Sequence, residues 1–224
     1  MISTNYSING AGVLLIEKYR NRFGRQEFAV ILFKDRRRNN YADAGGKIEI
    51  GENILQTAGE ELKEESANLF RIHPRFLDKF VVSKSYACFP LVVTGPMQDY
   101  GSIFSKYYKH NLALLHYTYS PDEFKETINM KRFYLVDLIN CGIMHTDNEF
   151  SYNSDIICGD AHGEYQSISG RTIGVIRELI KNGTIQFSAN MTTINLPLIM
   201  LDINPDFMSQ NHPFLNHTIT YYAK

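Results

Sequence analysis

The stretch of sequence that decides the fold is GGKIEIGENILQTAGEELKEESANL, residues 45–69. It opens on two adjacent glycines and continues into a run with helical periodicity, in which Leu55, Ala58 and Leu62 fall on one face. Six glutamates stand against two lysines, so the local charge is 2 − 6 = −4. At ~100° per residue, three of the glutamates form a stripe beside the apolar face: Glu61, Glu64 and Glu65. We interpret the stretch as a glycine turn followed by an amphipathic helix with an acidic edge.

This acidic edge has two interpretations. Neighbouring carboxylates repel one another unless a cation relieves them, and Mg²⁺ takes oxygen ligands and tolerates several carboxylates around it. Most runs of like charge are instead solvated helix faces. Helix spacing alone leaves both a metal site and a solvated face open.

The spacing of the whole stretch resembles the Nudix box, G-x5-E-x7-R-E-U-x-E-E-x-G-U, in which U is a bulky aliphatic residue. Counted from Gly46, the pattern gives Glu52, then seven residues, then the segment EELKEESAN at 60–68. Three positions depart from the pattern, with Glu60 in place of arginine, Ala67 in place of glycine and Asn68 in place of an aliphatic residue. The resemblance covers about a tenth of the chain.

The resemblance implies an α/β fold, a Nudix-like α/β/α sandwich with a mixed sheet and a C-terminal extension. It implies hydrolysis of a diphosphate linkage in a nucleoside-diphosphate-X substrate, with Mg²⁺ or Mn²⁺ as cofactor. By the motif match, Glu61, Glu64 and Glu65 are the catalytic and metal-binding carboxylates, and the carbonyl of Gly45 is the main-chain metal ligand. A later segment, 130–138, also resembles the family and makes Glu126, or failing that Glu123, a distal catalytic carboxylate.

The departure at Glu60 bears most directly on activity. The family's arginine orients the catalytic glutamates, whereas Glu60 adds a repulsive charge; Arg132, Arg171 or Lys63 are the candidates to compensate from elsewhere. Without compensation, the chain is a catalytically weak Nudix-fold nucleotide-binding module. An unrelated scaffold with an acidic surface helix is a further alternative. At the helix end, Asn68 is expected to take the left-handed conformation usually given to glycine, one residue late.

Basic residues suggest how a polyanionic substrate is held. Arg36 and Arg38, in a basic loop before the box, and Lys47 within it are candidate substrate-binding residues, as is Arg171 at the start of a later helix. Substrates left open by the resemblance are nucleotide sugars, ADP-ribose, nucleoside triphosphates, dinucleoside polyphosphates, diphosphoinositol phosphates and capped mRNA. The formal net charge of −1 argues against a dedicated RNA binder, so a small nucleotide is favoured and mRNA cap hydrolysis is the alternative.

Composition sets the remaining expectations. With 44% hydrophobic and 21% charged residues, the 224-residue chain is typical of a globular protein, which we divide into a catalytic core at 1–140 and a C-terminal extension at 141–224. The three widely spaced cysteines fit reduced thiols, and no signal peptide or membrane-spanning run is recognised, so a cytoplasmic protein without a membrane partner is expected. A homodimer contact through the extension stays open.

The pattern of the other segments predicts their structure. Strands are expected at 11–19, 27–34, 72–82 and 85–94, the last interrupted by Pro90 at an edge or bulge. A helix is expected at 102–115 and a long loop at 145–167. A second helix should begin after Ser169 as N-cap and stop at Asn182-Gly183.

Overall fold

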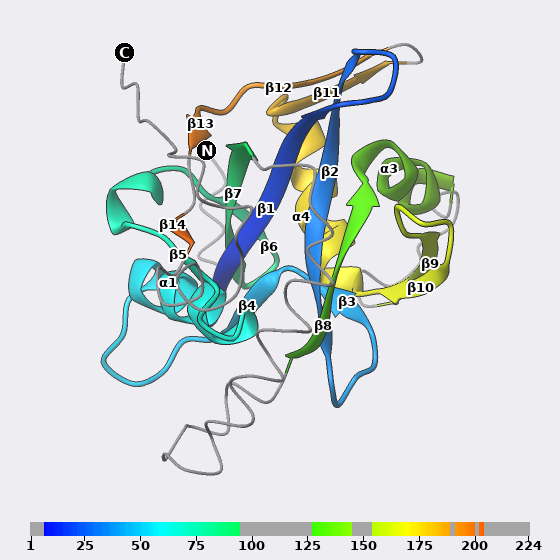
Figure 1. The fold of residues 1–224 in the computed structure, drawn as a ribbon. Helices are drawn as coiled ribbons and strands as arrows, with labels where there is room; N and C mark the ends of the chain where they lie inside the picture. Colours follow the sequence, from blue (N-terminus) through cyan, green and yellow to red (C-terminus); the bar gives the residue numbers. More distant parts are fainter. Residues whose placement is uncertain (1–6, 95–126, 145–153, 189–190, 200–201, 204–224) are drawn as a thin grey trace, which may run out of the picture.

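A mixed β-sheet forms the centre of the protein, as seen in a computed structural model that describes residues 7–94, 127–144, 154–188, 191–199 and 202–203. Within this part, the order along the sheet is β13-β7-β1-β2-β3-β10-β9, with β4 paired to β1, β6 to β7 and β8 to β2 (Figure 1). The strands are β1 Gly10–Arg20, β2 Gln26–Asp35, β3 Tyr41–Ala42, β4 Ala44–Lys47, β6 Val81–Ser83, β7 Tyr86–Thr94, β8 Thr127–Tyr134, β9 Ile156–Gly159, β10 Tyr165–Ile168 and β13 Leu198–Ile199.

Helices cover both faces of this sheet. They are α1 Ile54–Glu65 on one face and α3 Leu135–Met144 and α4 Gly170–Lys181 on the other, with a short 3₁₀ turn η1 at Pro74–Phe76. Two small antiparallel pairs complete the described elements: β5 Phe70–Arg71 with β14 Asp202–Ile203, and β11 Ile185–Ser188 with β12 Met191–Ile194. The expected α/β/α sandwich is confirmed.

Strand β1 explains why the sheet is buried on both faces. Its side chains alternate between the two layers, so Val13 and Leu15 face α1 while Leu14 and Ile16 face α3 and α4. All four are fully buried, and the strand therefore reads as a continuous apolar run in the sequence. It pairs with β7 in parallel, and on its other edge with β4 and then β2 in antiparallel register.

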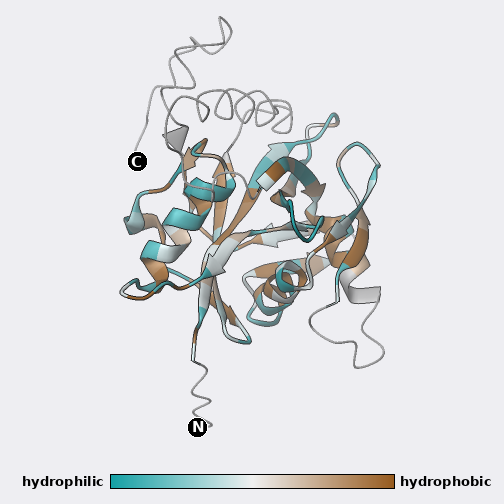
Figure 2. Ribbon diagram, turned by 90° about the horizontal axis from the view of Figure 1, so that it is seen from below, coloured by the Kyte–Doolittle hydropathy of each residue, from teal (hydrophilic) through white to brown (hydrophobic). Residues whose placement is uncertain are grey.

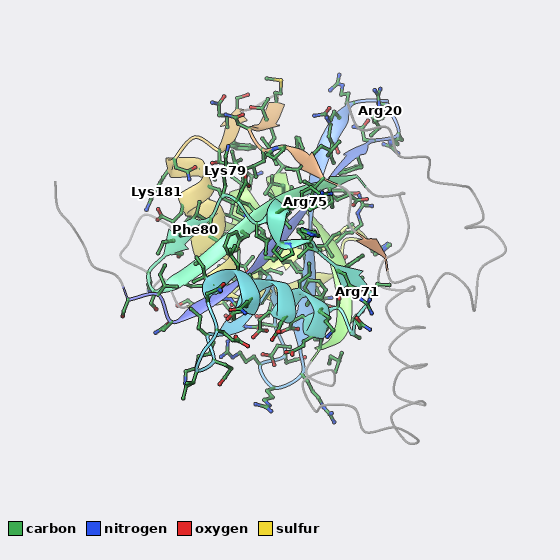
Figure 3. All side chains as sticks on the ribbon, turned by 90° about the vertical axis from the view of Figure 1, so that its left-hand side faces the viewer. Arg20, Arg71, Arg75, Lys79, Phe80 and Lys181 are labelled. Carbon is green, nitrogen blue, oxygen red and sulfur yellow. The ribbon has the colours of Figure 1, made fainter. Side chains whose placement is uncertain are left out.

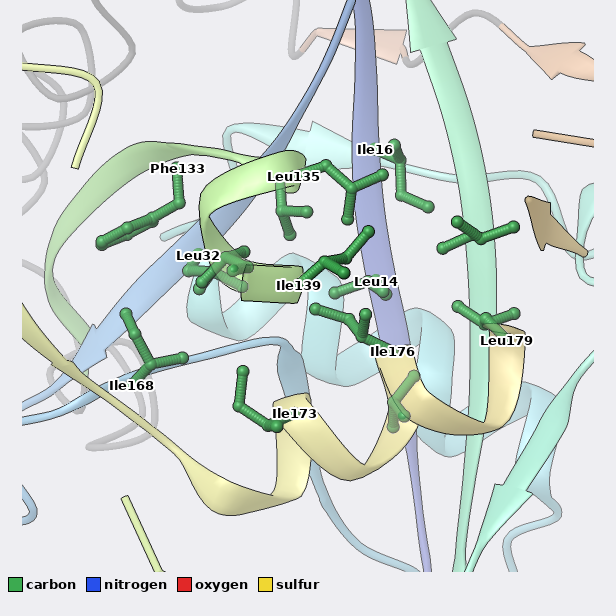
Figure 4. Close-up of a cluster of buried hydrophobic side chains, with 14 of the residues drawn as sticks. Leu14, Ile16, Leu32, Phe133, Leu135, Ile139, Ile168, Ile173, Ile176 and Leu179 are labelled. Carbon is green, nitrogen blue, oxygen red and sulfur yellow. The ribbon is translucent and has the colours of Figure 1, made fainter. Parts of the chain in front are cut away.

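The larger of the two cores lies between the sheet and helices α3 and α4. Figure 4 shows Leu14, Leu32 and Phe133 of the sheet meeting Ile139 of α3 and Ile176 of α4. In Figure 2, α1 and α4 contain both hydrophobic and hydrophilic residues, while α3 is mostly hydrophobic. Segments after residue 141 thus contribute to the same core as β1, while the division into units at 140/141 stays a prediction.

Several local expectations are met and others are corrected. Pro90 lies where the outer edge of β7 is free among the described strands, between the residues paired with β6 and those paired with β13. The strand expected at 72–82 is instead η1 followed by the short β6, because Pro74 starts a 3₁₀ turn capped by His73. The loop expected at 145–167 contains the β9–β10 hairpin. The helix expected at 102–115 lies outside the described residues.

The ends of the two predicted helices also show local detail. Asn68 has φ +65°, as expected, but Ala67 has φ +51° as well, so two successive residues take the left-handed conformation after α1. Ser169 is the N-cap of α4, yet its side chain makes no capping hydrogen bond. No helix of the described residues has the length and apolar character required to cross a bilayer.

Two glycine substitutions test the packing beneath the box. Gly12→Ala should lower the free energy of unfolding by about 1–3 kcal/mol, because an added Cβ overlaps the Ala44 carbonyl oxygen and the Tyr86 hydroxyl. Gly59→Ala should raise it by about 0.5–1 kcal/mol, because Gly59 lies inside α1 with open space at its Cβ. Urea unfolding of both variants measures the difference; equal effects from the two would contradict the packing seen here.

Candidate active site

The acidic helix α1 begins at Ile54, directly after its N-cap residue Asn53. The Asn53 side chain accepts hydrogen bonds from the N–H groups of Leu55 (3.0 Å) and Gln56 (3.1 Å), and Gln56 Oε1 accepts one from the Asn53 N–H (3.0 Å). This reciprocal capping box satisfies donors that a helix start leaves free. The Thr57 hydroxyl donates to Glu52 (2.7 Å), which lowers the pKa of that carboxyl. The motif glutamate Glu52 therefore helps to fix the first turn.

The three predicted glutamates lie along one edge of α1, which packs against β4. Gly45 and Gly46, expected in a turn, belong to this strand instead, because residues 44–47 pair with β1. Glu61, Glu64 and Glu65 are half-buried, whereas Glu60 is exposed. Red oxygen atoms are seen gathered along α1 in Figure 3. The Glu61 carboxylate lies so close to Gly46 that a Cβ on that residue would overlap it, and any larger residue there would displace the carboxylate. Helix α1 and strand β4 therefore meet at Glu61 and Gly46.

A buried carboxylate, Asp43, lies between β3 and β4 and anchors the start of β4. Its oxygens accept hydrogen bonds from the hydroxyls of Tyr86 (2.5 Å) and Thr172 (2.5 Å), and its backbone N–H donates to Thr172 Oγ1 (2.9 Å). Cys88 Sγ lies 3.8 Å from Asp43 Oδ2. The Asp43 side chain is fully buried, so these partners replace the water that its charge would otherwise require.

Arg171 connects Asp43 to Gly45 of β4 through hydrogen bonds. Its Nη1 donates to the Gly45 carbonyl (2.7 Å), its Nη2 to the Asp43 carbonyl (2.7 Å) and its Nε to Asp43 Oδ1 (3.3 Å). The guanidinium also lies over the Tyr86 ring, 4.7 Å from its centroid. Its side chain is only 25% exposed, so Arg171 is largely committed to the protein itself.

The electrostatics of this cluster keep Arg171 charged and Tyr86 neutral. Burial by itself would lower the pKa of Arg171, but the charge of Asp43, with smaller contributions from neighbours that include Glu65, raises it. Burial raises the pKa of the Tyr86 hydroxyl well above its usual value and does the same for the Cys88 thiol. Tyr86 therefore stays a hydrogen-bond donor to Asp43 at any ordinary pH.

The glutamate and main-chain oxygens are of the type that binds a hard divalent cation, although the described side chains do not converge on one point. Carboxylate and carbonyl oxygens are the ligands that Mg²⁺ and Mn²⁺ prefer, and the Glu61 carboxylate lies directly against Gly46, next to the Gly45 carbonyl. Among the described residues, however, no three acidic, histidine or cysteine side chains are close enough to form a metal cluster as they stand. Side-chain rotation of the glutamates would be needed to enclose an ion.

The other predicted site residues are dispersed. Arg36 and Arg38 are exposed in the turn between β2 and β3, where Asp35 accepts from the Arg38 N–H (2.9 Å). Lys47 is exposed at the end of β4, and Glu126 and Glu123 lie outside the described residues. These assignments stay predictions.

Arg171 is one of the three residues proposed to compensate for Glu60, and its side chain contacts the backbone of Asp43 and Gly45. Arg132 forms an ion pair with buried Glu17 (2.7 Å) and stacks on Tyr19, while Lys63 is exposed in the last turn of α1. Arg171 donates hydrogen bonds to the carbonyls of Asp43 and Gly45. Sequence reasoning missed Asp43, Tyr86 and Thr172; the only signal was an acidic residue directly before Ala44 and the glycines.

Comparison with known proteins gives structural neighbours only. No family model matches the sequence, and no curated protein matches it. An Ap4A hydrolase from C. elegans is similar over 59% of this chain and 84% of its own, with 20% identity and a TM-score of 0.34. A mutT/nudix family protein from Listeria innocua (13% identity, 58% of this chain and 80% of its own, TM-score 0.33) and one from Enterococcus faecalis (13%, 79% and 64%, TM-score 0.37) are also similar.

Similarity at this level transfers neither an activity nor a substrate to the chain. What the chain's own architecture defines is a Nudix-like α/β/α sandwich in which the acidic box follows β4 and forms α1.

Removing one hydroxyl tests the anchor. Tyr86→Phe should lower the free energy of unfolding by about 1–2 kcal/mol, because buried Asp43 loses a donor that nothing replaces. Tyr165→Phe is the matched control, since Tyr165 is 80% exposed and should change stability by less than about 0.5 kcal/mol. Chemical denaturation measures both; an unchanged Tyr86→Phe variant would remove Asp43 from its anchoring role.

Proposed function

We propose that this chain is a divalent-metal-dependent hydrolase of a diphosphate linkage in a nucleoside-diphosphate-X substrate. The observation that carries the proposal is the half-buried edge of Glu61, Glu64 and Glu65 on α1, with Glu61 held against Gly46. Half-buried carboxylates side by side are unfavourable for stability alone and become favourable when they hold a cation.

The residues have distinct roles in this proposal. Glu61, Glu64 and Glu65 supply metal oxygens from one helix edge, and Gly45 supplies a main-chain oxygen from β4. A bound Mg²⁺ or Mn²⁺ supplies charge neutralisation of the diphosphate and acidification of water. Glu61 is a candidate to take a proton from water, because its carboxylate lies against Gly46, next to the proposed main-chain ligand Gly45. Exposed Arg36, Arg38 and Lys47 are candidates to meet substrate phosphates.

A second candidate function is a nucleotide-binding module without turnover. Two observations favour it: Glu60 stands in place of the motif's arginine, and the described carboxylates do not form a closed cluster. If the chain is such a module, Glu65→Gln should leave nucleotide binding unchanged. If it is a hydrolase, Glu65→Gln should abolish turnover of the nucleotide.

A substrate panel with a matched pair of variants separates these functions. The panel contains ADP-ribose, nucleotide sugars, nucleoside triphosphates, dinucleoside polyphosphates and capped RNA, each with Mg²⁺ or Mn²⁺. Glu65→Gln should lower kcat by roughly 100-fold or more, because it removes a metal-binding charge. Glu49→Gln, an exposed glutamate of the same stretch outside the three, should leave kcat unchanged.

Turnover that survives Glu65→Gln would assign the activity to another site. Absence of turnover across the whole panel, with nucleotide binding retained in both proteins, would favour the binding module.

Metal binding has a readout that needs no substrate. Mn²⁺ at 100 times its Kd should stabilise the folded protein by about 2.7 kcal/mol and raise its Tm, because the ion binds the folded state alone. Glu61→Gln should reduce that increase, and Glu49→Gln should keep it. Thermal unfolding with and without a chelator measures the change; an equal Tm in both conditions contradicts a metal site.

A further inference from the structure

We infer that Arg171 is the positioning residue of the acidic box, supplying from α4 the cation that the motif places at position 60. The inference deepens the proposed function and rests on it. In this role Arg171 orients the backbone carbonyls of Asp43 and Gly45 and does not bind a substrate phosphate.

The contacts of Arg171 are those of a positioning residue. Two of its nitrogens bond to the carbonyls of Asp43 and Gly45, which lie two residues apart at the start of β4, each at 2.7 Å. A guanidinium presents its donors in a rigid fork, so two bonds fix the direction of both carbonyls at once. The Gly45 carbonyl keeps a second lone pair, which stays available for a metal ion.

The orientation of Arg171 is itself fixed by buried groups. Asp43 Oδ1 accepts from Arg171 Nε, and the same carboxylate is held by Tyr86 and Thr172. The Tyr86 ring supports the guanidinium from one side at 4.7 Å. Arg171 is thus held on several sides, which an exposed surface arginine is not.

Arg171 lies close to the glutamate edge. Arg171 bonds to the Gly45 carbonyl, and the Glu61 carboxylate lies against the next residue, Gly46. Glu60, which replaces the motif's arginine, is exposed and carries the opposite charge. Of the described cations proposed as substitutes, Arg132 is paired with Glu17 and Lys63 is exposed.

This arrangement makes an unusual prediction for metal binding. A fixed cation at the Gly45 carbonyl repels a divalent ion, while orientation of that carbonyl favours the reaction. Removing the cation should therefore leave metal affinity unchanged or increase it, yet slow turnover. Loss of folding would instead weaken both.

The experiment compares Arg171→Ala and Arg171→Lys with wild type. It measures kcat and KM on the substrate that wild type turns over, the Kd for Mn²⁺ alone on substrate-free protein, and the Tm. Lys181→Ala is the control, because Lys181 is an exposed cation at the far end of the same helix, with its ion pair to Glu178 in α4 (Figure 3).

Arg171→Ala should lower kcat by roughly 10- to 100-fold with KM within about threefold, because misplacement of catalytic groups affects turnover rather than binding. Its Kd for Mn²⁺ should be equal or lower by up to roughly tenfold. Arg171→Lys keeps the charge but loses the fork, so its Kd should match wild type and its kcat should fall roughly threefold to tenfold. Lys181→Ala should match wild type throughout.

If Arg171→Ala does not fold, Arg171→Lys decides in its place. Wild-type kcat in the variants overturns the inference, as does a joint loss of kcat and Mn²⁺ affinity. A rise in KM alone would assign Arg171 to substrate. Wild type that neither binds Mn²⁺ nor turns over any substrate overturns the proposed function, and the inference with it; wild-type turnover with unaffected variants overturns the inference only.

Discussion

The buried carboxylate of Asp43 is the constraint on which the rest of the site depends. A charge with no access to water is costly unless hydrogen bonds and an opposite charge replace the lost hydration. Asp43 obtains these from Tyr86 at the start of β7 and from Arg171 and Thr172 in the first turn of α4. Satisfying this one group therefore fixes the positions of β4, β7 and α4 relative to one another, and with them the turn that leads into α1.

The two glycines of β4 leave room for the side chains that pack against them. Tyr86 reaches Asp43 by crossing Gly12 and Gly45, where a Cβ on either residue would overlap its hydroxyl. The carboxylate of Glu61 occupies the corresponding space at Gly46. The Tyr86 hydroxyl thus packs against Gly45, and the candidate catalytic carboxylate of Glu61 packs against the neighbouring Gly46.

Helix α4 connects the hydrophobic core to the charges of the site. Ile173, Ile176 and Leu179 pack against the sheet, and this packing holds the helix start at which Arg171 leaves toward Asp43 and Gly45 (Figure 4). The Arg171 side chain is 25% exposed and bonded at three nitrogens, so its conformation is already fixed. An exposed arginine on α1 would have more conformational freedom to lose on being ordered. The exposed Glu60, by contrast, has its repulsion reduced by solvent.

The sequence by itself determined the elements whose signals are local: the apolar strands β1 and β2, the capped box helix with its acidic edge, and α4 ending at Asn182-Gly183. These depend on periodicity and on residues within one turn of each other. The short strands β9 and β10 were not predicted, because four-residue strands are stabilised by the sheet they join at β3. Only the tertiary structure decided the partners of the site. Asp43 meets Tyr86 across 43 residues and Thr172 across 129, and sequence spacing carries no information about contacts that the packing of separate layers creates.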